Sequence, residues 1–426
     1  MAKWIGNTII WFSLALTLSL FVLAKLDQGS ITGFSWLLLS QLLSLIGTTL
    51  LAMSFLLSGR FKFLENWFGG MDKVYKTHHI TGGIAFVMLL HHPLFLVVNI
   101  LPNVDFGWKY FWFSSLWSYD FGIASLYLML LMLVFTLLIN LPYSIWKKTH
   151  ELMGIGLMFG VLHIFTISSD VSRYMPLRWW MIVLLSVAGW SVVYKKFLYE
   201  IIGPRYKYLI EKVELRGDIF MIWLKPATKK MTFVGGQFVF AVFDKLGKEQ
   251  HPFSIASAPE GDSLVLGIKV LGDYTLTMKD LKVSDTATIW GPYGNFYEKS
   301  MSKSDLVWIA GGIGITPFMS MLPSFVNSGS GKKVDLFYCV TDKNEMVFED
   351  EIRNMIGQRE EVRYWEFCSN DRGRITAKAV VESVGSLENK KIMLCGPVPM
   401  MESLAKQFKE LGVKNRNIIF EDFNFK

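Results

Sequence analysis

The sequence has 426 residues, of which 52% are hydrophobic, 15% aromatic and only 19% charged. This composition excludes an ordinary soluble protein, and the length allows two or three domains. The formal net charge of +7 does not require a nucleic-acid partner, because much of it lies in short loops between apolar stretches. Long apolar stretches occupy residues 1–200, and charged residues recur every few positions after Tyr206. We predict a membrane half followed by a soluble half.

Six apolar stretches have the length that a membrane span requires, roughly 17 to 25 residues. Six spans place both termini on one side, and the basic loops on that side predict that it is the cytoplasmic side of the cell membrane. The alternative for the first stretch is a cleaved signal peptide ending near Ala24, but the length of the stretch favours a span. The six stretches are approximately 5–24, 35–57, 78–101, 122–141, 150–168 and 177–195.

Six of the seven histidines lie in the third and fifth of these stretches. A single histidine in such a place is usually a hydrogen-bonded core residue, yet ionisable side chains inside a membrane indicate function by default. The third stretch has His78 and His79 near its cytoplasmic end and His91 and His92 deeper, and the fifth has His150 near that end and His163 deeper. Facing imidazoles in two layers suit two hemes, each with two axial histidines.

Helix geometry selects between the histidines of the third stretch. His78 and His92 are fourteen residues apart, which puts them about 21 Å apart along a helix and only about 40° apart around it. The pairs that include His79 or His91 are thirteen residues apart and about 140° apart around the helix. The geometry favours His78 and His92, with His79 and His91 as the alternatives.

His150 and His163 in the fifth stretch are also thirteen residues apart. Tighter local winding of the 3₁₀ kind or a helix tilt has to absorb the angular difference. Pairing by depth predicts an inner heme on His78 and His150 and an outer heme on His92 and His163. The absence of a CxxCH motif implies b-type heme. Zinc is the disfavoured alternative, because four histidines at two depths cannot form one tetrahedral site.

The soluble half begins with short alternating strands from Tyr206 to about residue 290, which predict a small antiparallel β-barrel. The stretch "DLVWIAGGIGITPFMSML" follows as strand, glycine-rich turn and helix, with later strands "KVDLFYCV" and "KKIMLCGP". This order predicts an α/β domain with a parallel sheet. Its glycines allow close backbone approach, and the helix opening at Thr316 offers N–H groups to a phosphate.

Further motifs accompany this turn. They are "HPFSIASAP" at 251–259, "KVLGDYT" at 269–275, "GPYG" at 291–294, "CGPVPM" at 395–400 and the closing "EDFNFK". Each alone suits an ordinary turn or strand end. Together with "HHITG" in the third stretch, they make essentially the whole chain resemble the NADPH oxidase and ferric reductase superfamily, most closely its bacterial NADPH oxidase homologues. The resemblance implies a six-helix transmembrane heme domain at 1–200, an FAD-binding β-barrel at 204–298 and an α/β NAD(P)H-binding domain at 303–426.

The resemblance also implies roles for single residues. Ser254 is expected near the flavin N5, Cys395 near the nicotinamide, and Phe423 stacked on the flavin, with Phe425 as the alternative. Thr341, with Lys343, is the candidate for the 2′-phosphate, so NADPH is favoured and NADH stays open. The residues implied to bind FAD are His251, Pro252, Phe253, Ser254, Lys269, Gly272, Thr275 and Phe423. The residues implied to bind the nicotinamide nucleotide are Gly311, Gly312, Gly314, Thr316, Thr341, Cys395, Gly396 and Pro397.

The implied activity is that of a superoxide-forming NAD(P)H oxidase. Electrons pass from cytosolic NADPH through FAD and two b-type hemes to dioxygen on the opposite side of the membrane. Leu96 stands where animal oxidases of this superfamily have another histidine, so two alternatives stay open for the acceptor. One is a ferric-chelate reductase, and the other is a subunit supplying electrons to a quinone or a periplasmic partner. Membrane lipid is an expected partner, and no obligatory protein partner or nucleic acid is inferred.

Overall fold

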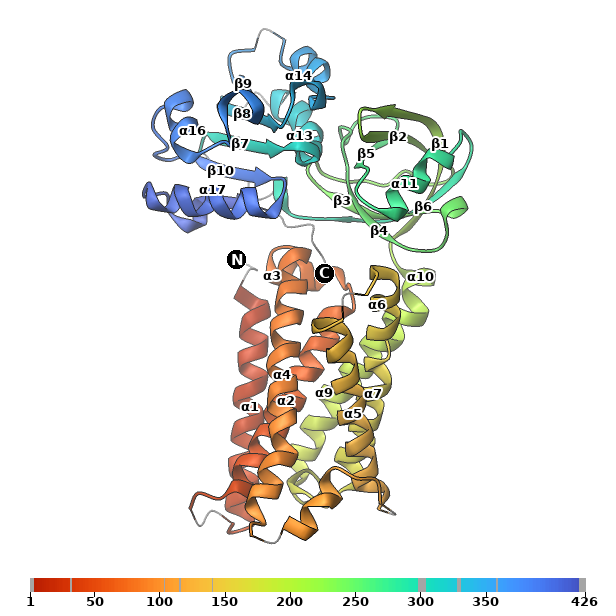
Figure 1. Cartoon of the computed structure of the whole chain (residues 1–426), viewed down its shortest axis with the longest axis vertical. Coiled ribbons are helices and arrows are strands. Elements are labelled where there is room, and N and C mark those ends of the chain that lie inside the picture. Colours follow the sequence, from red (N-terminus) through yellow and green to blue (C-terminus); the bar gives the residue numbers. More distant parts are fainter. Residues whose placement is uncertain are drawn as a thin grey trace. The chain divides into compact units, whose positions relative to one another are not determined.

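The computed structural model describes residues 4–30, 33–102, 104–114, 116–139, 141–297, 304–327, 331–357 and 359–420. The chain forms two compact units, Met1–Glu200 and Ile201–Lys426. We call the first the helical unit and the second the sheet unit, after the elements that Figure 1 shows in each.

The helical unit contains long helices joined by short turns and by short helical segments (Figure 1). The long helices are α1 (Ile5–Asp27), α2 (Trp36–Ser58), α4 (Met71–Asn99), α5 (Trp117–Leu137), α7 (Met153–Thr166) and α9 (Met175–Val193). The shorter segments are α3 (Lys62–Phe68), the 3₁₀ helix Val104–Tyr110, α6 (Tyr143–His150), α8 (Asp170–Arg173), the π-helix Tyr194–Leu198 and α10 (Tyr199–Ile202).

Small and hydroxylated side chains bring these helices together. A Cβ atom on Gly47 of α2 would lie 3.2 Å from the carbonyl oxygen of Ala85 on α4, so the two backbones pass close to each other. The Thr17 hydroxyl of α1 lies 2.9 Å from that of Thr49 on α2 and accepts a 2.8 Å hydrogen bond from the Trp180 indole of α9. Such contacts hold helices together in lipid, where burying apolar surface gives no driving force.

Within the described residues, five helices are long and apolar enough to cross a membrane: α1, α2, α4, α5 and the segment Met175–Ile202. The fifth predicted span, at 150–168, is not confirmed. The structure divides 150–168 at a turn after His150, and α7 has only 14 residues, about 21 Å against a hydrocarbon core of about 30 Å. The predicted start of the third span was also too late, because α4 begins at Met71.

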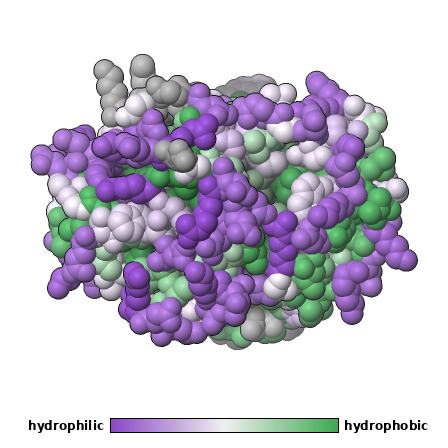
Figure 2. Space-filling view, turned by 90° about the horizontal axis from the view of Figure 1, so that it is seen from above, coloured by the Kyte–Doolittle hydropathy of each residue, from purple (hydrophilic) through white to green (hydrophobic). Residues whose placement is uncertain are grey.

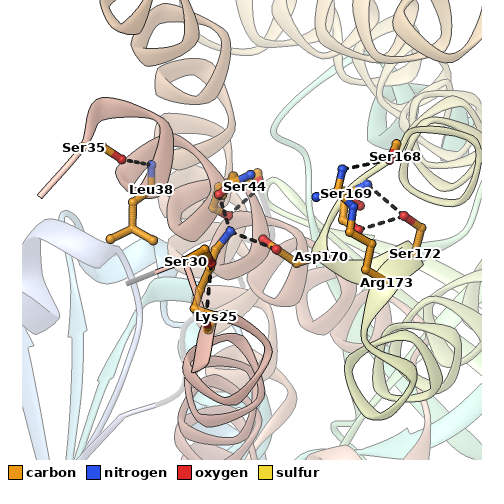
Figure 3. Close-up of polar contacts among 11 residues, drawn as sticks. Lys25, Ser30, Ser35, Leu38, Ser44, Ser168, Ser169, Asp170, Ser172 and Arg173 are labelled. Atoms are coloured by element: carbon orange, nitrogen blue, oxygen red, sulfur yellow. Dashed lines mark hydrogen bonds and ion pairs between the residues drawn. The ribbon is translucent and has the colours of Figure 1, made fainter. Parts of the chain in front are cut away.

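A buried ion pair ties α1 to the short helix α8. The Lys25 amine lies 2.9 Å from the Asp170 carboxylate and donates a 2.8 Å hydrogen bond to Gln41 of α2. Lys25 is 7% exposed and Asp170 4%. Figure 3 shows the amine directed at the carboxylate, with the hydrogen-bonded turn of Ser169 and Ser172 at α8 nearby. The pair joins the first helix to a segment 145 residues further along the chain.

The sheet unit begins with a curled antiparallel half-barrel of six strands in the order β4-β3-β6-β1-β2-β5. An isolated antiparallel bridge between Ile255 and Leu266 links the two ends of the curl. The predicted barrel is therefore confirmed as a half-barrel. Its elements are β1 (Arg205–Arg216), β2 (Ile219–Pro226), β3 (Phe238–Phe243), β4 (His251–Ser254), β5 (Leu264–Lys269), α11 (Asp273–Leu276) and β6 (Thr286–Tyr293).

The second part of this unit is a five-stranded parallel sheet, as predicted, in the order β11-β10-β7-β8-β9. Its strands are β7 (Leu306–Gly311), β8 (Val334–Val340), β9 (Val362–Cys368), β10 (Lys391–Cys395) and β11 (Ile418–Phe420). Its helices are the 3₁₀ turn η6 (Gly312–Ile315), α13 (Thr316–Asn327), α14 (Glu349–Ile356), α15 (Ser369–Arg372), α16 (Ala377–Val384) and α17 (Val398–Glu410).

The half-barrel and the parallel sheet share a hydrophobic core. Ile219 and Met221 of β2 pack in one buried cluster with Trp308 of β7 and Phe318 of α13. The Ser320 hydroxyl of α13 also donates a 2.7 Å hydrogen bond to the Ser257 carbonyl after β4. By contrast, the face of the molecule seen in Figure 2 is largely hydrophilic.

Candidate functional site

Two histidines of α4 are held by two serines of α2. The Nδ1 atom of His78 lies 2.8 Å from the Ser54 carbonyl oxygen, and that of His92 lies 3.1 Å from the Ser40 carbonyl oxygen. Each serine hydroxyl donates back to the carbonyl of its histidine, at 3.2 Å for Ser54 and 2.8 Å for Ser40. The serines are fourteen residues apart, as are the histidines, so the antiparallel helices repeat the same contact at two levels.

These contacts determine which ring nitrogen of His78 and His92 has a lone pair available for a metal ion. A backbone carbonyl only accepts hydrogen bonds, so in a neutral imidazole the proton is on Nδ1 and the lone pair is on Nε2. Metal-bound histidines are commonly oriented by such a second hydrogen bond. Sequence reasoning missed Ser40 and Ser54, although their spacing, equal to that of the histidines, was a usable signal.

The partners of these histidines come from the segment of α6 and α7. The ring of His150 lies 6.2 Å from that of His78, and His163 is close enough to His92 for the two rings to interact electrostatically. His163 Nδ1 is 2.6 Å from the Ser118 carbonyl oxygen, whereas the buried Nδ1 of His150 has no hydrogen-bond partner among the described residues. The structure thus brings the predicted residues together in two pairs.

The turn between α6 and α7 accounts for the thirteen-residue spacing of His150 and His163. Amide groups of Leu152, Gly154 and Ile155 donate to carbonyls three residues earlier, at 3.0, 3.2 and 2.9 Å. This is the tighter 3₁₀ pattern, and it lets the two histidines face the same neighbouring helix. Close packing also contributes, because a Cβ on Gly122 of α5 would lie 2.8 Å from the Nδ1 of His163.

The alternative histidines have different surroundings. His79 is exposed. His91 Nδ1 lies 2.7 Å from the Val87 carbonyl oxygen, and its ring contacts Phe95, so both partners belong to α4 itself.

In the sheet unit, the motifs at 251–259 and 269–275 contact each other through two stacked rings. The His251 ring of β4 lies 3.6 Å from the Tyr274 ring of α11, at an interplanar angle of 23°. Burial raises the pKa of Tyr274 to about 12, so this phenol stays neutral at ordinary pH. The Thr275 hydroxyl accepts hydrogen bonds from the amides of Leu271 and Gly272, at 2.9 and 3.1 Å. These bonds fix the loop that leads into α11.

The rest of β4 forms the edge of the half-barrel. Pro252, Phe253 and Ser254 are half-buried and lie opposite residues of β3, with Ser254 facing Phe238. Lys269 ends β5 and forms a 3.1 Å ion pair with Asp218. Lys269 is therefore paired with the turn that joins β1 to β2. The sequence did not predict this contact.

The parallel sheet has a topological switch between β7 and β10. From β7 the chain continues to β8 and β9 on one side, then returns to β10 on the other, and ligands of such sheets bind in the crevice at this point. Gly311 ends β7 and Cys395 ends β10, and Gly396 and Pro397 lie against Gly311. A side chain on Gly314 would overlap the Cys395 carbonyl, so only glycine allows the two turns to touch.

The start of α13 is the polar end of this crevice. Gly312 has a φ of +54°, and a Cβ there would meet no atom within 4 Å. Thr316 is 2% exposed, and its hydroxyl donates a 2.9 Å hydrogen bond to the Ile313 carbonyl. The hydroxyl thus stabilises the turn, while the first amides of α13 are available to a phosphate.

Some predicted residues are not part of these clusters. Thr341 is exposed at the end of β8, and its carbonyl accepts a 3.1 Å hydrogen bond from the Asn370 amide. Lys343 forms a 3.2 Å ion pair with Glu366. Phe423 and its alternative Phe425 lie outside the described residues.

Three stretches of the chain match known protein families, in the same order as the helical unit, the half-barrel and the parallel sheet. Residues 43–161 match the family described as ferric reductase like transmembrane component. Residues 207–307 match an FAD-binding domain, and residues 308–406 match an oxidoreductase NAD-binding domain. The helical unit therefore contains a ferric-reductase-like component, and the sheet unit contains FAD-binding and NAD-binding domains.

Two relatives in sequence each resemble about half of the chain. The Pyrococcus furiosus sulfhydrogenase 2 subunit gamma is 29% identical over 43% of this chain and 70% of its own length. A Bacillus anthracis flavohemoprotein is 23% identical over 50% of this chain and 60% of its own length. A Malassezia yamatoensis flavohemoglobin structure with bound FAD and heme covers 97% of this chain and 98% of its own, with a TM-score of 0.53 and 16% identity. At that identity the likeness shows the fold alone.

Proposed function

Because the chain has the three-domain layout of the NADPH oxidase and ferric reductase superfamily, we propose that it is a membrane-bound, superoxide-forming NADPH oxidase. Electrons from cytosolic NADPH cross the membrane by way of FAD and two b-type hemes and reduce dioxygen on the other side. The domains are those expected from the sequence, at 1–200, 204–298 and 303–426. α7 is the fifth of six spans, and both termini are cytoplasmic.

The observation that carries this proposal is the repetition of histidine pairs at two levels. His78 with His150 and His92 with His163 come from facing segments. Backbone carbonyls accept from Nδ1 of three of the four rings, which leaves Nε2 with a lone pair for iron. When bound between such pairs, heme accepts and releases single electrons.

The sheet unit supplies the binding residues for the other two cofactors. FAD and NADPH bring the hydride and single-electron chemistry when bound. The His251 and Tyr274 stack and the Thr275 loop hold the FAD, with Ser254 beside the reacting ring. The turn at Gly311, Gly312 and Gly314 and the start of α13 hold the nucleotide diphosphate. Cys395, Gly396 and Pro397 would border the nicotinamide and Thr341 would contact the 2′-phosphate, and the resemblance assigns Phe423 the role of stacking on the flavin.

The test uses protein purified in detergent and supplied with FAD and NADPH in air. We expect it to reduce cytochrome c, and superoxide dismutase should suppress most of that reduction, because superoxide is the carrier between the two proteins. Omitting FAD is the control. Reduction that dismutase leaves unchanged would contradict superoxide formation. Rapid reduction of a ferric chelate under nitrogen, without superoxide in air, would instead identify a metal reductase.

The ring stack in the half-barrel gives a separate prediction for FAD binding. Tyr274→Ala removes the face on which His251 rests, and such ring pairs contribute about 0.5–1.5 kcal/mol. The FAD dissociation constant should therefore rise about threefold to tenfold, measured by quenching of flavin fluorescence. Tyr274→Phe keeps the ring and is the matched control, so its FAD affinity should stay near that of the natural protein. Equal losses in both variants would refute the role of the stack.

A further inference from the structure

An apolar groove of about 450 Å³ lies between α7 and α9. Among the described residues, Ser186 is the only polar side chain that lines it. The groove lies outside the histidine site: Val161 and Phe165 line it, and His163, two residues from each, is about 200° from either around the helix. Other lining residues include Gly154, Leu157, Gly189 and Val192.

The length of the groove suits one half of a bilayer. On α7 its lining residues run from Gly154 to Phe165, which corresponds to roughly 16 Å of helix. Half of the hydrocarbon core is about 15 Å thick. Met158 at the groove and Trp190 beside it are 51% and 55% exposed, so in a membrane this face is open to lipid. A hydrocarbon chain of one leaflet therefore fits its length and its chemistry.

One end of the groove is basic. A Cβ on Gly154 would lie 3.3 Å from Val192, where α7 and α9 approach each other. Directly after α9 comes the π-helix Tyr194–Leu198, a rare element that frequently marks functional sites. It carries Lys196, which lies 3.7 Å from Glu151, with both side chains about half exposed. Such an exposed pair is held weakly, so Lys196 is able to exchange Glu151 for another anion.

The second lysine of the π-helix, Lys195, lies in an excess of positive charge. Its amine is 4.8 Å from the centre of the Tyr199 ring. Arg60 and Lys147 act on it with like charge, and Glu151 and Glu200 with opposite charge. Together with Lys196, this makes three basic side chains and two carboxylates around Lys195.

From the groove and its basic end, we propose that this site binds an anionic phospholipid. One acyl chain lies between α7 and α9, and the phosphate contacts Lys195 and Lys196. The bilayer supplies the ligand at high concentration, and basic residues next to a membrane attract anionic headgroups. The π-helix leads through α10 into β1, so the bound headgroup steadies the segment that connects the two units.

The test measures the lipid retained by the purified protein in native mass spectrometry. The protein is incubated with phosphatidylglycerol or phosphatidylcholine that carry identical acyl chains. We expect a preference of at least about tenfold for phosphatidylglycerol, from two lysines near its phosphate, and a smaller preference at high salt. The double variant Lys195→Ala/Lys196→Ala should lose the preference. Lys76→Ala, which removes an exposed lysine of α4, is the control and should keep it.

A second variant tests the groove itself. A Cβ on Gly189 would meet no atom within 4 Å, so Gly189→Leu fills the groove and should reduce retention of both lipids. Equal binding of the two lipids by the natural protein, or an unchanged preference in the double lysine variant, would overturn the proposal. Displacement of bound lipid by a short-chain quinone would also overturn it, by identifying a quinone site. The double variant Lys195→Ala/Lys196→Ala keeps the test decisive if Gly189→Leu does not fold.

Discussion

His92→Leu is expected to halve the heme content of the purified protein and to abolish electron transfer to acceptors beyond the membrane. The leucine has no lone pair for iron, and it also loses the hydrogen bond to the Ser40 carbonyl. NADPH oxidation with ferricyanide should continue, because the FAD and nucleotide sites lie in the sheet unit. The measurements are a pyridine hemochrome assay and cytochrome c reduction sensitive to superoxide dismutase.

The neighbouring histidine provides the matched control. His91→Leu changes the same kind of side chain one residue away, but among the described residues His91 forms its hydrogen bond within α4, to the Val87 carbonyl. It should retain the full heme content and the superoxide activity. If His91→Leu loses heme and His92→Leu keeps it, the assignment of the α4 ligands is wrong. If both variants keep it, the proposal of an outer heme on His92 fails.

Lys25→Met is expected to destabilise the helical unit by about 3–5 kcal/mol, because it leaves the buried Asp170 charge without its partner. The change should lower the midpoint of thermal unfolding in detergent. Asp170→Asn should also lower it, since a buried lysine then lacks its counter-ion.

The double variant Lys25→Met/Asp170→Leu distinguishes pairing from packing. When both charges are removed together, neither is left buried alone, so most of the lost stability should return. Additive losses in the double variant would contradict this account. Lys76→Ala is again a suitable control, since this exposed lysine should leave the midpoint unchanged.

Local patterns in the sequence were sufficient for the main parts of the fold. Alternation predicted the half-barrel, the strand–turn–helix pattern at Gly311 predicted the parallel sheet, and helix geometry favoured His78 with His92. The turn after His150 was missed as a break, because neither Gly nor Pro stands at Glu151 and Leu152, between α6 and α7. Apolar composition alone does not distinguish one long helix from two short ones.

Other features depend on contacts between distant segments. Lys25 and Asp170 are 145 residues apart, and nothing near either residue in the sequence predicts their pairing. Ser40 and Ser54 look like ordinary small residues of an apolar helix. Their spacing matches that of the histidines, but the contacts themselves are seen only when α2 lies against α4. Thr341 and Phe423 were carried over from the resemblance. Their roles stay predictions, since Thr341 is exposed and Phe423 lies outside the described residues.

The matched spacing on α2 and α4 limits how this sequence can change. Inserting one residue between His78 and His92 would rotate one of them by about 100° relative to the other and move it by about 1.5 Å. One histidine would then face away from its serine. To restore both contacts, α2 would need a matching insertion between Ser40 and Ser54. The spacing of the serines on α2 and the spacing of the histidines on α4 therefore constrain each other. Insertions or deletions are tolerated outside these intervals far more readily than within them.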